Sequence, residues 1–221
     1  MKVLVACEES QRVCMAFREK GHEAYSADIQ EPSGGHPEWH ILGDVLPFIN
    51  GNCKFKTMDG KEHQIEGEWD LLIAHPPCTY LSNAGAVRMR VNGEIVKERY
   101  EKAMEAKKFF MKFYNASCKM IAIENPTSMK IVGLPEYTQA IQPYQFGHPY
   151  SKRTCLWLKN LPKLVPTEII ENHTPYVNGG CKDAHGNYRR FQGRKERDQK
   201  TRSKTFEGIA KAMAEQWGAE D

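Results

Sequence analysis

A thiol and a carboxyl group follow two apolar segments of the chain in similar ways. Residues 69–74 run into His-Pro-Pro-Cys, which ends at Cys78, and residues 119–123 run into Glu124-Asn125-Pro126. Both apolar runs predict buried strands. Proline ends sheet pairing and stiffens the chain beside it. If the two strands lie in one parallel sheet, Cys78 and Glu124 emerge at the same edge and face one pocket.

Such a pair suits addition chemistry on a pyrimidine ring. Carbon 5 of cytosine is too weak a nucleophile to take a methyl group directly, but a thiolate that adds to carbon 6 makes it enamine-like. A carboxyl group at ring nitrogen 3 stabilises the charge that develops during the addition. Transfer of the methyl group, removal of the carbon 5 proton and departure of the thiolate complete the reaction. Cys78 is therefore the candidate nucleophile, and Glu124 the candidate partner of nitrogen 3.

The segments that must position these groups alternate between strand and helix. Their hydrophobic patterns and end signals predict further strands at 2–6, 23–27 and 153–158, and helices at 10–20, 96–115 and 206–217. The glycine- and proline-containing stretch 30–39 predicts a loop, and the polar stretch 50–67 a surface excursion. This order is typical of an open α/β sheet, which binds ligands at the carboxyl ends of its strands.

Composition and length restrict the class of protein. The chain has 221 residues, of which 40% are hydrophobic and 27% charged, as in an ordinary globular protein. We expect one domain over residues 1–221, and no membrane segment, because no apolar run approaches the roughly 18 residues that a span needs. The amino terminus lacks the apolar stretch of a signal peptide. Seven scattered cysteines, without metal-ligand spacing, favour a reducing cytoplasmic location and no metal site.

A basic strip interrupts the otherwise near-neutral chain. Residues 182–204 hold nine Lys or Arg against three Asp or Glu, whereas the whole chain carries a net charge of only +3. Within this strip, Tyr188-Arg189-Arg190-Phe191 interleaves aromatic and basic side chains, which can stack on bases and neutralise phosphates. The strip is either a nucleic-acid footprint, with Arg189, Arg190 and Arg194 as candidate contacts, or a solvated loop. Lys152, outside the strip, is a further candidate nucleic-acid contact.

Several motifs together resemble those of the cytosine-5 DNA methyltransferases. Pro76-Pro77-Cys78 is similar to the family's nucleophile motif, and Glu124-Asn125-Pro126 to its Glu-Asn-Val motif. The resemblance is closest to the short members carried by bacteriophages and prophages, and it extends over nearly the whole chain. It is carried by residues 3–8, 69–78, 123–126, 142–148, 152–158 and 202–210.

The resemblance implies a Rossmann-like methyltransferase fold, a three-layer sandwich with a mostly parallel sheet, that uses S-adenosylmethionine and acts on DNA. Asp28 would then accept hydrogen bonds from the ribose hydroxyls, Asp44 from the adenine amino group, and Glu8 would pair with the methionine ammonium. Arg153, with Lys152 as the competing candidate, would steady the flipped base through its carbonyl oxygen. The other residues expected to line the cofactor site are Cys7, Ser10, Ile29, Val45, Pro76 and Thr205.

Two departures from the family bear on cofactor and substrate. The turn after the first strand, Glu8-Glu9-Ser10-Gln11, lacks the family's glycines, so a side chain crowds the cofactor's usual approach. Only the short basic insert 159–201 stands in place of a large target-recognition domain. Because a base inside a duplex must be flipped out before a thiol can reach it, we expect relaxed or short sequence specificity, or a single-stranded or nucleotide-sized substrate.

Three other functions are compatible with parts of the pattern. The altered turn and the short insert also describe a methyltransferase fold kept as a non-catalytic nucleic-acid-binding or anti-defence protein. A cysteine hydrolase would pair Cys78 with His75 or His148, but leaves Glu124 and Asp28 without a role. Amino-group methyltransferases are disfavoured, because they place an aromatic residue after the paired prolines, where this chain has Cys78.

Overall fold

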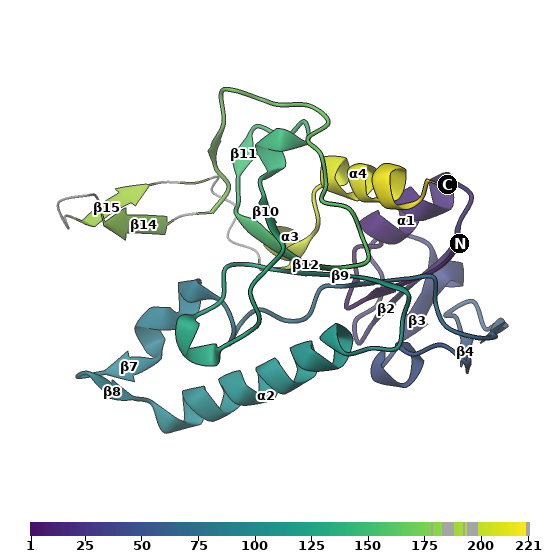
Figure 1. The fold of residues 1–221 in the computed structure, drawn as a ribbon, viewed down its shortest axis with the longest axis horizontal. Coiled ribbons are helices and arrows are strands. Elements are labelled where there is room, and N and C mark those ends of the chain that lie inside the picture. Colours follow the sequence, from purple (N-terminus) through teal and green to yellow (C-terminus); the bar gives the residue numbers. More distant parts are fainter. Residues whose placement is uncertain (178, 183–187, 192, 194–198, 220–221) are drawn as a thin grey trace.

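The computed structural model describes residues 1–177, 179–182, 188–191, 193 and 199–219. Its centre is a seven-stranded sheet with the strand order β10-β12-β9-β6-β1-β2-β3 (Figure 1). The strands are β1 (Lys2–Ala6), β2 (Glu23–Asp28), β3 (His40–Leu42), β6 (Leu71–Ala74), β9 (Met120–Asn125), β10 (Gln139–Ile141) and β12 (Thr154–Lys159). β3, β2, β1, β6 and β9 run parallel, and β12 is antiparallel to both of its neighbours. The predicted α/β class with a mostly parallel sheet is confirmed.

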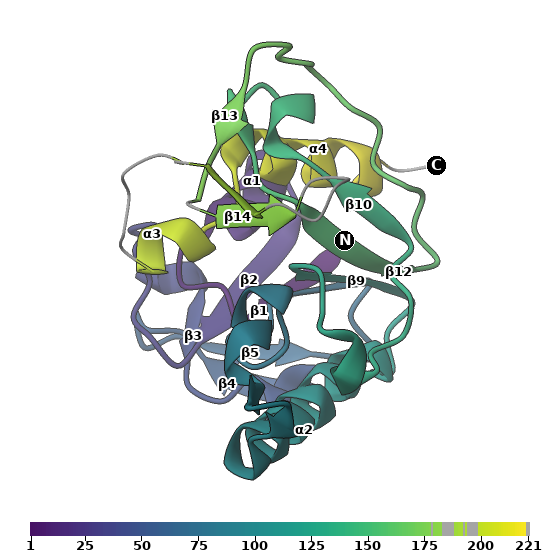
Figure 2. The same cartoon turned by 90° about the vertical axis from the view of Figure 1, so that its left-hand side faces the viewer.

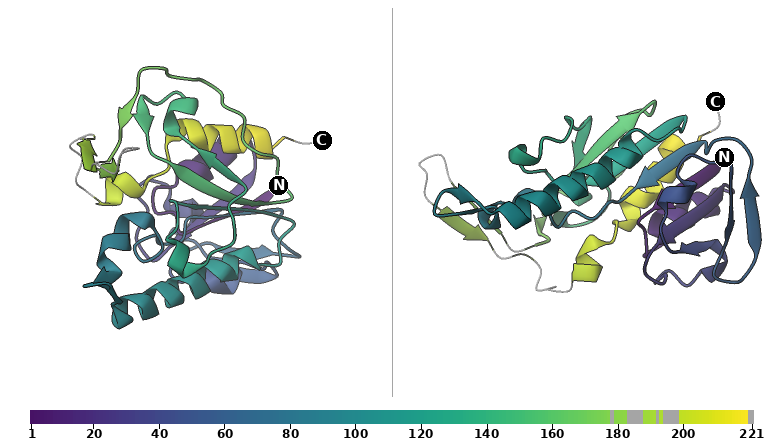
Figure 3. Two further views of the ribbon diagram at one scale, coloured as in Figure 1. Left: turned by 60° about the vertical axis from the view of Figure 1, so that its left-hand side comes forward. Right: turned by 90° about the horizontal axis from the view of Figure 1, so that it is seen from below.

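Helices cover both faces of the sheet. α1 (Arg12–Glu19) and α4 (Glu207–Trp217) lie on one face, and α2 (Lys97–Tyr114) lies on the other (Figures 1 and 3). Alternate side chains of each strand pack into one or the other of the two resulting cores, because side chains along a strand point to opposite faces. Phe17 and Trp217 are buried in the first core, and Phe110 and Phe113 in the second. Each such side chain stabilises the fold by about 1.5–3 kcal/mol through burial.

Further short strands and short helices lie outside the seven-stranded sheet. Four two-stranded pairings join β4 (Cys53–Lys56) to β5 (Glu62–Ile65), β7 (Arg90–Val91) to β8 (Glu94–Ile95), β11 (Tyr150–Ser151) to β13 (Thr174–Pro175), and β14 (Gly179–Lys182) to β15 (Tyr188–Phe191). The short helices are η1 (Pro37–Trp39), η2 (Leu46–Phe48), η3 (Asn83–Arg88), η4 (Lys130–Val132), η5 (Pro143–Gln145) and α3 (Gln199–Ser203). Among the residues that the structure describes, no helix is long and apolar enough to cross a membrane.

The carboxyl ends of the parallel strands meet at one end of the molecule. In register, Ala74 of β6 pairs with Ile123 of β9, so the segments after these strands start side by side. Because β12 runs the other way, Lys152 and Arg153, which directly precede it, reach the same end. The view onto this end shows α3 and β14 there as well (Figure 2). Chemistry-bearing residues distant in sequence are thus collected at one edge.

The element bounds differ from the sequence prediction in informative places. β9 continues through Glu124 and Asn125, since pairing with β12 extends the strand past the apolar run. α1 begins at Arg12 rather than at residue 10, and Gln11 holds the cap position with a left-handed backbone. Within the stretch 50–67, predicted as an excursion, the chain forms the β4–β5 hairpin, whose Phe55 and Ile65 are buried.

Candidate active site

The segment that carries Cys78 is braced against the end of β9. The backbone N–H groups of Leu81 and Ser82 both donate to the Cys78 carbonyl, at 3.0 and 2.9 Å. The Asn125 side chain donates to the carbonyl of buried Pro76 at 2.7 Å. Met129 N–H donates to the Leu81 carbonyl at 2.8 Å. Hydrogen bonds from the β9 side therefore fix the loop that positions the thiol.

Glu124 forms an ion pair with His75, the first residue after β6. The Nδ1 atom of His75 lies 3.2 Å from Oε2 of Glu124, and their side chains are 11% and 17% exposed. Burial raises the pKa of Glu124, but the hydrogen bond to His75, the charge of His75 and that of Lys152 hold this pKa below its usual value. Burial lowers the pKa of His75, but Glu124 and the charge of Glu8 raise it above its usual value. The pair is therefore stabilised as carboxylate and imidazolium.

Cys78 lies within electrostatic reach of Glu124 and of two cations, Lys152 and Arg202. Burial raises the pKa of the Cys78 thiol, and the charge of Glu124 raises it further, whereas Lys152 and Arg202 lower it. Burial in turn lowers the pKa of Lys152, which Glu124 and Cys78 partly offset. The Lys152 ammonium donates to the Arg202 carbonyl at 2.7 Å. We call Cys78, His75, Glu124 and Lys152 the thiol–carboxylate cluster.

Arg153 does not belong to this cluster, which corrects the preference for it over Lys152. Its guanidinium donates to the Tyr137 hydroxyl at 2.7 Å and lies 5.7 Å from the centre of that ring. The Arg153 residue is exposed. Lys152, in contrast, is half-buried and its ammonium donates to the Arg202 carbonyl, so the two neighbouring side chains have different partners. Of these two neighbouring residues, Lys152 is the one whose charge acts on the thiol.

A second group of predicted residues gathers at the ends of β1, β2 and β3. The charges of Asp28 and Asp44 add to the effect of burial and raise the pKa of Cys7 to about 12. One oxygen of Asp28 accepts the Gln30 N–H at 2.9 Å, and one of Asp44 the Leu46 N–H at 3.0 Å. The structure thus brings three of the predicted cofactor residues together.

Two apolar residues next to these carboxylates differ in exposure. Ile29, directly after Asp28, is 78% exposed, whereas Val45 is only 4% exposed. A carboxylate pair beside an exposed apolar side chain offers hydrogen-bond acceptors for hydroxyl or amino groups and a surface for a flat ring. Asp28, Ile29 and Asp44 supply these features, and Val45 supports them from the core.

The turn from β1 to α1 is built differently from the expectation. Both oxygens of Glu8 accept backbone N–H groups at the start of α1, from Val13 at 2.6 Å and from Cys14 at 3.2 Å. Glu8 is 4% exposed, and its carboxyl group caps the start of α1. Its carboxylate is therefore engaged by the helix rather than free for a ligand ammonium.

A loop covers the same turn. Gln11 holds this loop, because its amide donates to the His36 carbonyl at 2.8 Å and accepts the His36 N–H at 3.0 Å. A Cβ atom on Gly34 would lie 2.9 Å from the Ser10 carbonyl oxygen, so only glycine allows the loop to pack this closely. Ser10 is consequently 6% exposed. Cys7 and Gln11, at φ values of 59° and 58°, adopt the left-handed conformation that favours glycine.

The buried carboxyl group of Glu8 predicts a specific pH dependence of stability. Burial is the largest influence on its pKa, which is raised from 4.5 to about 7. The folded state then binds the proton more tightly than the unfolded state, so stability falls as the pH rises from 4.5 to 7, by up to about 3 kcal/mol. Glu8→Gln should flatten this part of the profile, measured as the unfolding free energy in urea across pH 4.5–8. Glu19→Gln, an exposed change in α1, the helix that Glu8 caps, is the control and should leave the slope intact; an equal slope in Glu8→Gln would contradict the assignment.

The remaining predicted residues lie elsewhere. The Thr205 carbonyl accepts a hydrogen bond from Arg12 at 2.7 Å, just before α4. Arg189 and Arg190 lie in β15, paired with Cys181 and Gly180 of β14, and Arg194 lies outside the described residues.

Two residues near the thiol have no role in the methyltransferase site that the sequence predicts. The sequence suggests His75 only as the hydrolase partner of Cys78, and the available signal for its position is that it directly follows an apolar strand. In the sequence, Arg202 belongs only to the longer motif at 202–210. Its charge lowers the pKa of Cys78, and this effect depends on the tertiary position of α3. Among the described residues, no hydrogen bond joins the Cys78 thiol to His75 or His148; His148 Nε2 instead accepts the Gly208 N–H at 2.9 Å.

Comparison of the chain with models of known protein families finds no match, and comparison with curated proteins finds no significant match. Within the part of the chain that the structure describes, no group of three or more His, Cys, Asp or Glu side chains is placed to hold a metal ion.

Proposed function

We propose that the protein transfers a methyl group from S-adenosylmethionine to carbon 5 of cytosine in DNA, through a covalent adduct on Cys78. The proposal rests on one observation above all. A thiol, a carboxylate and a half-buried lysine come from three different segments, and their charges act on one another at the carboxyl edge of a mostly parallel sheet. The motif resemblance supplies the reaction, and this arrangement is what that reaction requires.

The residues present fit the adenosine end of the cofactor. Asp28 and Asp44 each use one oxygen for a local backbone N–H, and the structure gives their other oxygens no hydrogen-bond partner among the described residues. They would accept from the ribose hydroxyls and the adenine amino group, beside Ile29. The predicted contacts of Glu8 and Ser10 with the methionine end do not fit, because Glu8 caps α1 and Ser10 is covered. When bound, the cofactor supplies an electrophilic methyl group.

The protein's own groups would divide the remaining work. The Cys78 sulfur forms a bond to carbon 6, and the ring electrons move toward nitrogen 3 and carbon 5. Glu124 takes up the proton held on its partner His75 and passes it to nitrogen 3, which becomes basic as the ring electrons reach it, and recovers this proton when the adduct breaks down. After carbon 5 has gained the methyl group it loses its proton to a base, and the carbon 6–sulfur bond breaks to return the thiolate. Lys152 supplies the positive charge that favours the thiolate at the start and the end.

The direct test is a transfer assay with methyl-labelled S-adenosylmethionine and three substrates: a duplex, a single-stranded oligonucleotide and deoxycytidylate. We expect 5-methylcytosine as the product, identified by mass spectrometry after digestion. We also expect the single strand or the nucleotide to be accepted at least as well as the duplex, since the insert 159–201 is short. Activity confined to one long duplex site would contradict this substrate preference, and a methylated nitrogen would contradict the mechanism.

A second candidate function follows from the covered turn. With Glu8 engaged by α1 and the loop 30–36 packed over Ser10, the fold also suits a nucleic-acid-binding or anti-defence protein that does not use the cofactor. Such a protein would keep the basic strip but would not need the carboxylates at the ends of β2 and β3.

Asp28→Ala discriminates between the two candidates. For the enzyme, we expect calorimetry to give clear binding of S-adenosylmethionine, weakened at least about tenfold by this change, because two charge-assisted hydrogen bonds are lost. Glu31→Ala, an exposed change in the adjoining loop, is the control. Absence of binding by the wild-type protein would favour the binding protein over the enzyme.

A further inference from the structure

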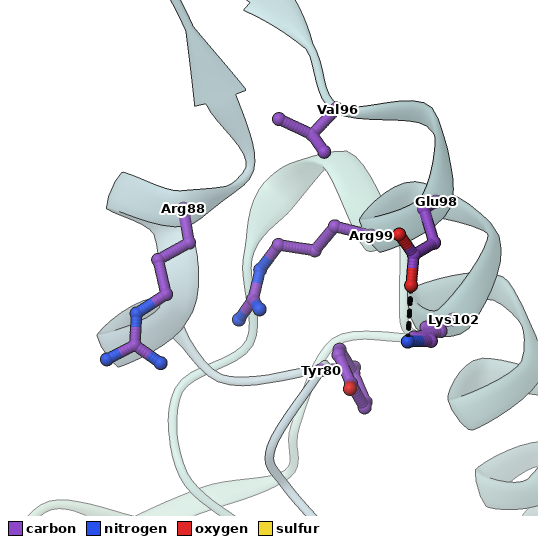
Figure 4. A pocket seen from close by; sticks show the side chains of 6 residues that line it. All are labelled: Tyr80, Arg88, Val96, Glu98, Arg99 and Lys102. Carbon is purple, nitrogen blue, oxygen red and sulfur yellow. Dashed lines mark hydrogen bonds and ion pairs between the residues drawn. The ribbon is translucent and has the colours of Figure 1, made fainter.

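A depression of about 230 Å³ opens next to the loop that carries Cys78 (Figure 4). It lies between η3 and the first turns of α2, and Tyr80, two residues after Cys78, forms part of its wall. The thiol–carboxylate cluster does not contribute to its lining, so the depression is a separate feature of the same end of the molecule. Its lining residues are Tyr80, Arg88, Val96, Glu98, Arg99 and Lys102.

The lining carries an excess of positive charge. Lys102 pairs with Glu98 at 2.6 Å, which leaves two guanidinium groups without a balancing carboxylate. Arg88 and Arg99 form no ion pair or hydrogen bond with any residue that the structure describes, and Nε of Arg99 is buried without an acceptor. A buried donor without a partner costs about 1–3 kcal/mol. An anion with several acceptor oxygens would satisfy both guanidinium groups.

Arg99 is held in place rather than free to swing. Its guanidinium lies 5.2 Å from the centre of the Tyr80 ring, and the Lys102 ammonium lies 5.9 Å from the same ring centre. A Cβ atom on Gly85 would come within 2.7 Å of Nη2 of Arg99, so the guanidinium packs closely against the backbone of η3 at this glycine. A donor that is already ordered loses little entropy when it binds a ligand.

We propose that this depression binds a phosphate group of the substrate nucleotide or of its immediate neighbour in the strand. The inference rests on the proposed function, because it takes the base that Cys78 attacks as its reference point. Arginine donates in a fork that matches phosphate oxygens, and the Tyr80 ring offers a stacking surface for an adjacent base. Since the turn after Cys78 ties Tyr80 to the nucleophile, a phosphate held here belongs to a nucleotide at or beside the target cytosine.

The test measures binding in the absence of cofactor, in a Cys78→Ser background that cannot form the adduct. The probes are a fluorescent single-stranded oligonucleotide, the matching duplex and deoxycytidylate. Arg88→Ala and Arg99→Met should each weaken binding about 3–10-fold at low salt. Each should also reduce the slope of log affinity against log salt concentration by the amount expected for the loss of about one phosphate contact. Lys97→Met is the control, because Lys97 is on the same helix, pairs with Glu101 and does not line the depression; it should change affinity less than about twofold.

The outcomes separate the possible sources of the phosphate. Losses with the oligonucleotides alone identify a strand phosphodiester, and a loss that includes deoxycytidylate identifies the phosphate of the nucleotide itself. Unchanged binding of all three probes by both variants would overturn the proposal. Arg88 is exposed, so its variant reports on binding even if Arg99→Met is less stable in thermal unfolding. Because no methyl transfer is measured, a failure of the proposed reaction would leave these affinities unchanged and would be recognised separately.

Discussion

Replacement of Cys78 by serine is expected to reduce methyl transfer by at least about a thousandfold, to the background of the assay. Serine keeps the size of the side chain but not its nucleophile, since a hydroxyl next to Glu124 does not ionise near neutral pH. The loop itself should survive, because its bracing hydrogen bonds involve the backbone of Cys78 and the Asn125 side chain. Cys53→Ser is the control, as Cys53 is another half-buried thiol, in β4 and away from the cluster.

A mechanism-based substrate makes the same expectation visible as a covalent bond. In 5-fluorocytosine a fluorine atom stands where carbon 5 normally carries its proton, so no base can remove it and the carbon 6–sulfur bond persists. We expect a stable adduct with the wild-type protein, mapped by peptide mass spectrometry to Cys78 and absent from Cys78→Ser. An adduct mapped to Cys7, the half-buried thiol at the end of β1, would contradict the assignment of Cys78 as the nucleophile.

The convergence of Cys78 and Glu124 on one edge followed from the sequence because it depends only on local signals. An apolar run that stops at His75-Pro76-Pro77 and another that runs into Glu124 define two buried strands and their ends. Parallel pairing of β6 with β9 then places both ends together. The same reasoning placed Asp28 at the end of β2, where its charge and that of Asp44 act on Cys7.

The choice between Lys152 and Arg153 could not be made in the same way. Which of two successive side chains points inward depends on the antiparallel register of β12 against β9 and on partners from distant segments. The Arg153 guanidinium donates to the Tyr137 hydroxyl, and the Lys152 ammonium donates to the Arg202 carbonyl. Neither partner is adjacent in sequence, so local patterns do not contain the answer.

The covered turn after β1 is a further case in which tertiary contacts decide. Ser10 has the residue type of a cap, but Glu8 reaches the N–H groups of Val13 and Cys14 from inside the turn. Gln11 then fixes the loop above it through His36. The absence of glycine in this turn was visible in the sequence, whereas its structural consequence, a buried carboxyl group with a raised pKa, needed the fold.

The strongest test of the corrected site compares Lys152→Met with Arg153→Met. The two residues are neighbours and carry the same charge, but Lys152 is half-buried and its charge acts on the thiol, whereas Arg153 is exposed. Loss of the Lys152 ammonium removes a charge that lowers the pKa of Cys78, so that burial and Glu124 raise this pKa further. We expect methyl transfer to fall about a hundredfold in Lys152→Met, and less than about threefold in Arg153→Met.

The pH dependence of thiol alkylation shows whether Lys152 acts through this charge. Iodoacetamide labelling of Cys78, followed by peptide mass spectrometry, should require a higher pH in Lys152→Met than in the wild-type protein, because a thiol with a higher pKa ionises later. Lys152→Arg keeps the positive charge and should restore much of the labelling at neutral pH, which a purely structural role of Lys152 would not explain. If Arg153→Met shifted the profile and Lys152→Met did not, the guanidinium would be the cation at the thiol, and the arrangement from which we derive the reaction would have to be abandoned.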